Sequence, residues 1–269
     1  VENSRIGRVK LELDTRYAKP AEHPDILDHA LESMELRETA ADMLAMLVPV
    51  ELVTEPLYAR ELRDLDTAIA ALREAGVEDT RHAAFNAFGM HLNVSLEPPD
   101  PARAIRIAAA FAFVEPWLRR QMGLDLARRA TPFVDPYPGG YTRALARAFA
   151  ADKPPSLPEF IRLYAYWNPT RNRGLDMWPL LGFLDADAAE TALEAPVKNP
   201  RPAFHYRLPD SRIEVTGWTP RTELARWDRI EQVADDATAF AVARSAALRL
   251  LTWHGTREEY DTVIAGVMG

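Results

Sequence analysis

The 269-residue sequence contains no cysteine, which excludes thiol catalysis, thiolate zinc sites and disulfide bonds. It also contains no run of Lys and Arg, and its net charge is −8, so a nucleic-acid-binding groove is not expected. No apolar run approaches the roughly 18 residues that a membrane span requires. We therefore expect a cytoplasmic protein whose partners include neither nucleic acid nor a membrane.

Four common catalytic and phosphate-binding motifs are also absent, namely GxGxxG, the Walker P-loop, GxSxG and HExxH. An apolar fraction of 48% is enough for a large core that needs no metal or disulfide to fold. The sequence begins at Val1, without an initiator Met, a signal peptide or a transit pattern. From this we expect the native chain to begin further upstream.

Alternating apolar and polar residues predict strands at 8–14, 49–57, 88–96 and 202–214. Helical periodicity predicts helices between and after them, at 23–48, at 59–76, from 100 onward, from Ser156 to Asn168, and in a tail from about 220 to 265. One-sided alternation is typical of antiparallel strands with one packed face. With no repeat or linker visible, the sequence predicts a single α+β domain over residues 1–269.

The segment FGMHLNVSL, residues 88–96, has an unusual polar face. One side of this predicted strand is apolar, whereas the other carries His91, Asn93 and Ser95. Solvent-exposed strand faces more commonly carry Lys, Glu, Thr or Arg. This face therefore has the composition of a metal-binding or hydrogen-bonding site.

The other predicted strands carry chemically related polar faces, formed by Glu12 and Asp14, by Glu51, and by His205 and Arg207. In one curved sheet these faces would converge. Carboxylates with imidazole suit Mg²⁺ or Mn²⁺, and a nearby Arg suits phosphate. The combination favours phosphoryl transfer from a nucleotide.

Other interpretations of the same residues stay open. Each strand taken alone is more often an ordinary solvated amphipathic strand than part of a site. A metal-dependent hydrolase would need only the metal and water. The cluster of Asn168, Arg171, Asn172 and Arg173 fits a hydrogen-bonded helix end as well as a rim that binds an anionic substrate.

Four segments resemble, in their order and spacing, the amidoligase family of glutamine-synthetase-like carboxylate–amine ligases: VELVTEPL, FGMHLNVSL, NPTRNRGLDMWPLL and NPRPAFHYRLPDSRI. The resemblance covers nearly the whole chain, and the last two segments resemble a bacterial branch. It implies a curved, mainly antiparallel sheet that encloses the site, with helices packed outside. It also implies that ATP phosphorylates a carboxylate, that divalent cations assist, and that an amine displaces the phosphate. The substrates would be small-molecule or peptide carboxylates and amines.

The resemblance also implies roles for individual residues. It implies catalytic roles for Glu51, Arg207 and Arg212, metal ligands among Glu12, Asp14, Glu51, His91 and His205, and ATP binding by His91, Asn93, Ser95, Arg171, Asn172 and Arg207.

Two features depart from the family pattern. A strand of the type F-G-x-E-x-E, expected before residues 8–14, is absent, and His205 stands where related ligases often carry a glutamate. A catalytically inactive member that binds a nucleotide or a peptide is therefore the alternative.

Overall fold

The computed structural model describes residues 6–13, 50–77, 89–123 and 134–269, and it divides the chain into two compact units. The first unit comprises residues 1–88 and 211–221, and the second comprises residues 89–210 and 222–269. The predicted helix at 23–48 and Asp14 lie outside the described residues. The assignment of one domain to residues 1–269 stays a prediction.

The first unit contains the first two predicted strands, β1 (Val9–Leu13) and β2 (Val50–Thr54), which form an antiparallel two-stranded sheet. A short 3-10 turn at Ala59–Glu61 leads into α3 (Leu62–Glu74), which confirms the predicted helix. Arg73 of α3 donates hydrogen bonds to backbone oxygens of the 211–221 segment, including those of Val215 and Trp218 at 3.4 Å. These bonds attach a distant stretch of sequence to this unit.

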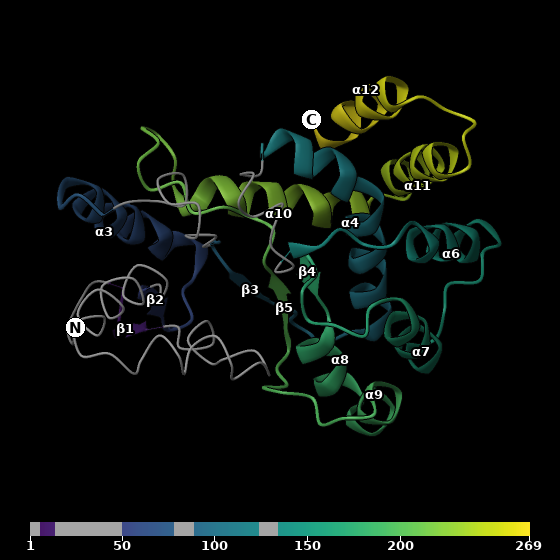
Figure 1. Ribbon diagram of the computed structural model, residues 1–269, viewed down its shortest axis with the longest axis horizontal. Helices are drawn as coiled ribbons and strands as arrows, with labels where there is room; N and C mark the ends of the chain where they lie inside the picture. Colours follow the sequence, from purple (N-terminus) through teal and green to yellow (C-terminus); the bar gives the residue numbers. More distant parts are fainter. Residues whose placement is uncertain (1–5, 14–49, 78–88, 124–133) are drawn as a thin grey trace, which may run out of the picture. The chain divides into compact units, whose positions relative to one another are not determined.

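The second unit contains a three-stranded antiparallel sheet with the order β3–β5–β4. Its strands are β3 (Leu92–Ser95), β4 (Leu175–Asp176) and β5 (Ala203–Tyr206), so the predicted strands at 88–96 and 202–214 are confirmed in shorter form. The α+β class is confirmed, with antiparallel sheets and many helices (Figure 1).

The helices of the second unit follow the capping and breaking signals in the sequence. Asp100 caps α4 (Pro101–Gln121) by accepting a hydrogen bond from Ala102 N–H, and Ser156 with Glu159 forms a capping box at the start of α7 (Leu157–Trp167). Pro116 does not end α4, which continues for another turn. The other helices are α6 (Gly139–Ala150), α8 (Trp178–Leu184), α9 (Ala186–Leu193), α10 (Pro220–Asp235), α11 (Ala237–Leu251) and α12 (Arg257–Met268).

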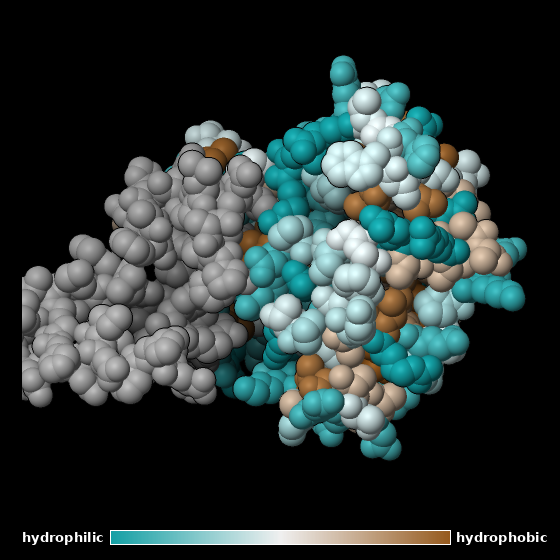
Figure 2. Space-filling view, turned by 45° about the vertical axis from the view of Figure 1, so that its right-hand side comes forward, coloured by the Kyte–Doolittle hydropathy of each residue, from teal (hydrophilic) through white to brown (hydrophobic). Residues whose placement is uncertain are grey.

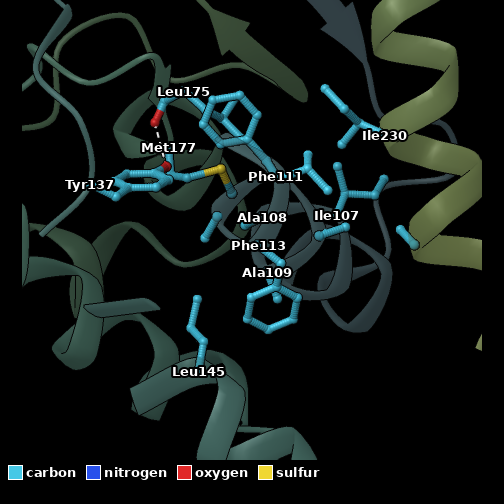
Figure 3. Close-up of a cluster of buried hydrophobic side chains, with 14 of the residues drawn as sticks. Ile107, Ala108, Ala109, Phe111, Phe113, Tyr137, Leu145, Leu175, Met177 and Ile230 are labelled. Atoms are coloured by element: carbon cyan, nitrogen blue, oxygen red, sulfur yellow. Dashed lines mark hydrogen bonds between the residues drawn. The ribbon is translucent and has the colours of Figure 1, made fainter. Parts of the chain in front are cut away.

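Helix α4 is the centre of the core, because its residues from Ile107 to Val114 are all buried. Figure 3 shows Phe111 of α4 near Tyr137 and Leu175, and the Tyr137 hydroxyl donates a 2.6 Å hydrogen bond to the Leu175 carbonyl. A helix buried on most sides packs between other elements rather than on the surface. Phe111 also meets Tyr206 of β5 edge-on, with 5.9 Å between ring centroids, so α4 contacts the three-stranded sheet at this point.

The helical surface in Figure 2 mixes hydrophilic residues with small apolar patches. Among the described residues, no helix combines the length and the hydrophobicity of a membrane span.

Candidate functional site

A row of three polar residues crosses the three-stranded sheet. In the strand register, His205 of β5 lies opposite Asn93 of β3 on one side and opposite Asp176 of β4 on the other. Directly opposed residues in antiparallel strands point to the same face. The ring of His91 also meets that of His205 edge-on, with 5.1 Å between centroids. The polar face predicted for the 88–96 strand thus continues into the predicted polar face of β5. We call the combined surface, which consists of His91, Asn93, His205 and Asp176 with the arginines around them, the β5 polar face.

Asp176 is the buried anchor of this face, with no exposed surface. Its Oδ2 accepts a 2.8 Å hydrogen bond from Arg171 Nε and lies 3.3 Å from His205 Nδ1, and its Oδ1 accepts one from Trp178 N–H. Burial alone would raise the pKa of Asp176, but the His205 hydrogen bond and the Arg171 charge outweigh it and hold this pKa below its usual value. Asp176 is therefore a carboxylate at neutral pH.

His205 is a neutral imidazole at pH 7. Burial lowers its pKa, the hydrogen bond to Asp176 counteracts this, and the charges of Arg207 and Arg201 lower the pKa further. A neutral ring that faces a carboxylate carries its proton on the facing nitrogen, here Nδ1. Asp176 thus sets both the orientation and the tautomer of His205.

Three arginines surround the pair of Asp176 and His205. Besides Arg171, these are Arg201 and Arg207. Arg201 donates hydrogen bonds to Asn93 Oδ1 at 2.6 Å and to the Asn199 carbonyl at 3.1 Å. Arg207 donates one to the carbonyl of Arg171. Burial lowers the pKa of Arg201, and the charge of Arg171 lowers it further, so the two guanidinium groups repel each other. Among the described residues, Arg201 forms no ion pair with a carboxylate. The face thus concentrates positive charge, which suits a phosphate or carboxylate ligand.

Two further predicted nucleotide-binding residues have ordinary surroundings. Ser95 is exposed and lies opposite Ala203, two residues along β3 from Asn93. Asn172 uses its backbone, which receives a 2.8 Å hydrogen bond from Asp135 N–H and donates one to the Thr170 hydroxyl. Their roles in binding ATP stay predictions.

The remaining predicted ligands belong to the first unit. Glu12 of β1 lies opposite Glu51 of β2 in the strand register, and Arg212 lies in the 211–221 segment. Within the parts of the chain that the structure describes, no three His, Asp or Glu residues gather in a way that could hold a metal ion. The metal set of Glu12, Asp14, Glu51, His91 and His205 stays a prediction.

The sequence interpretation missed two residues of the β5 polar face, Asp176 and Arg201. Asp176 ends a two-residue strand that is buried on both faces, so no alternation reveals it. Arg201 could have been found from the sequence. It is separated from His205 and Arg207 by even numbers of residues, so in an extended chain its side chain lies on the same face as theirs.

Comparison with known proteins gives one match. The model of a family described as "Putative amidoligase enzyme" matches residues 1–228, which is most of the chain. No curated protein and no solved structure matches.

Proposed function

This chain belongs to the amidoligase family, and we propose that it is a ligase that uses ATP to join a carboxylate and an amine in the cytoplasm. A carboxylate oxygen attacks the γ-phosphorus of ATP, and ADP leaves. The amine nitrogen then attacks the carbonyl carbon of the acyl phosphate, phosphate leaves, and the nitrogen gives up a proton. The substrates are a small-molecule or peptide carboxylate and an amine.

The positive charge on the β5 polar face is the observation that carries this proposal. Phosphoryl transfer requires groups that position the phosphates and neutralise their charge, rather than a covalent protein intermediate. The side chain of Arg171 keeps 34% of its surface exposed while its Nε is held by Asp176. Arg201 donates its hydrogen bonds to the uncharged oxygens of Asn93 and Asn199, so these contacts do not neutralise its positive charge, which can attract an anionic ligand. Both guanidinium groups are thus positioned before any anion arrives.

Asp176 and His205 act as positioning residues in this proposal. The buried carboxylate holds Arg171 and His205 through a shared oxygen, so the two side chains are ordered together. Supporting hydrogen bonds of this kind keep binding groups in productive geometry and reduce the entropy lost on binding.

Mg²⁺ or Mn²⁺ is the proposed companion of ATP, and when bound it would neutralise negative charge on the phosphates. Glu12 and Glu51, which lie opposite each other in the strand register, are two of the proposed ligands. The described residues do not assemble three ligands, so no step of the mechanism is derived through the metal. A glutamine-synthetase-like curved sheet around the site belongs to the same proposal.

Thermal unfolding with Mg-ATP tests the nucleotide dependence. At a ligand concentration about 100 times its Kd, binding stabilises the folded state by about 2.7 kcal/mol. For a chain of this size the melting midpoint should rise by about 5–10 °C. Arg201→Gln should reduce the rise, whereas Arg162→Gln, an exposed change on α7, should not.

Two outcomes would contradict the proposal. A protein that melts cooperatively but shows no shift with Mg-ATP would not be an ATP-dependent ligase. A shift in Mg-ATP without ADP release in the presence of any carboxylate and amine pair would favour the inactive, nucleotide-binding member.

A further inference from the structure

A pocket of about 560 Å³ lies among helices α4, α6, α11 and α12 of the second unit. This volume is typical of small-molecule sites. No residue assigned above to the β5 polar face lines it. The pocket is therefore a feature of the second unit that is separate from the site proposed for the ligase activity.

The walls of the pocket are mainly apolar, with Ala112 and Pro116 from α4 and Ala247, Leu250 and Leu251 from α11. Tyr137 and Tyr260 add aromatic surface. Their hydroxyls are engaged elsewhere, since Tyr137 donates to the Leu175 carbonyl at 2.6 Å and Tyr260 donates to the Phe113 carbonyl at 2.7 Å. Both tyrosines therefore line the pocket while their hydroxyls are already satisfied, which suits an apolar ligand body.

Two of the lining arginines are already neutralised. Arg119 lies 3.3 Å from Glu115 Oε1, and the Tyr137 N–H donates a 2.9 Å hydrogen bond to the other carboxylate oxygen. Arg120 is paired with the Asp261 carboxylate. The buried Glu115 thus has both oxygens bonded, and it does not require a cationic ligand.

Arg257 is a lining arginine that, among the described residues, has no such carboxylate partner. Arg257, the first residue of α12, is exposed and forms no ion pair with any carboxylate in the described parts of the chain. Thr142 of α6 also lines the pocket and is only 6% exposed.

We propose that this pocket binds a small organic monoanion with an apolar body, such as a medium-chain carboxylic acid in its ionised form. The Arg257 guanidinium binds the carboxylate at the edge of the pocket. The apolar walls take the hydrocarbon chain, whose burial is favourable because it removes apolar surface from water.

Calorimetric titration of the full chain with sodium octanoate tests the proposal, with 1-octanol as the neutral ligand of the same chain length. We expect one octanoate per chain, bound more weakly as the salt concentration rises. Arg257→Gln should weaken octanoate binding about three- to fivefold and leave octanol binding unchanged, because the lost contact is an exposed ion pair. Arg249→Gln is the matched control, since Arg249 is an exposed arginine of α11 outside the lining.

Filling the pocket gives the second arm of the test. Ala247→Phe places a ring in the space that the chain would occupy, so both ligands should bind at least tenfold more weakly. If this variant does not fold, Leu250→Trp serves the same purpose from a half-buried position. The proposal is overturned if octanoate does not bind the parent protein, or if its binding is unchanged in Arg257→Gln and in a folded pocket-filling variant.

Discussion

Replacing Asp176 by Asn tests the central contact of the β5 polar face. The change preserves the shape of the side chain but removes the charge that holds Arg171 at 2.8 Å and His205 at 3.3 Å. A hydrogen bond to a charged group contributes about 1.5–3 kcal/mol, and breaking a buried ion pair costs about 3–5 kcal/mol. Because the Arg171 side chain is 34% exposed, solvent screening reduces its share. We therefore expect a loss of about 2–4 kcal/mol in the free energy of unfolding.

The pH dependence of this loss has a defined sign. The pKa of Asp176 is lower in the folded protein than in the unfolded chain, where an Asp titrates near pH 3.9. Its contribution is therefore complete above about pH 4 and disappears as the pH falls through the folded value. The difference in stability between the parent and Asp176→Asn should shrink in the same range.

Urea unfolding followed by circular dichroism, at neutral pH and along an acid series, measures both quantities. In a separate thermal unfolding experiment at pH 7, the variant should melt about 4–16 °C below the parent. Asp187→Asn, an exposed change in the first turn of α9, is the control and should lie within about 0.5 kcal/mol of the parent. A loss below about 1 kcal/mol, or a loss that stays constant into acid, would refute the assignment of Asp176 as a charged anchor.

Three further predictions follow from individual contacts. Gly140→Ala should lower stability by about 1–3 kcal/mol, because the new Cβ would lie 2.0 Å from Trp167 Cη2; Gly266→Ala, with nothing within 4 Å, should instead be neutral or stabilising in thermal unfolding. Burial raises the pKa of Glu115, so the stability contributed by its protonated form is complete below about pH 4 and is lost as the pH rises through the folded pKa. In an unfolding series, the free energy of unfolding of Glu115→Gln should therefore increase relative to that of the parent as the pH rises. Arg207→Lys keeps the charge but loses the planar fork, so the apparent KM for ATP should rise, and unchanged nucleotide kinetics would remove Arg207 from the site.

The sequence predicted the faces of the strands better than their pairing. Alternation has a period of two residues, so it shows within one segment that His91 and Asn93 share a face. That this face continues across His205 to Asp176 depends on the register of strands far apart in the chain. Register is determined by long-range packing and is not visible in any single segment.

Contacts between distant helices were equally hidden. The helix predicted from Ser156 to Asn168 depends on local signals, and the structure confirms it, with a capping box at Ser156. The pocket of α4, α6, α11 and α12 depends on how helices pack, for which the sequence shows only which faces are apolar. Pro116 illustrates the same limit, since its surroundings allow α4 to continue past a residue that usually interrupts a helix.

The replacement of an expected glutamate by His205 changes the location of the negative charge on the β5 polar face rather than removing it. His205 is neutral, but its Nδ1 lies 3.3 Å from the Asp176 carboxylate on the neighbouring strand. The polar row across the sheet therefore still contains one carboxylate, displaced by one strand. Because Asp176 is fully buried and both of its oxygens are hydrogen-bonded, its role in the proposed site is to position His205 and Arg171 rather than to meet a ligand itself. The departure from the family pattern at residue 205 is thus compatible with a working anion site.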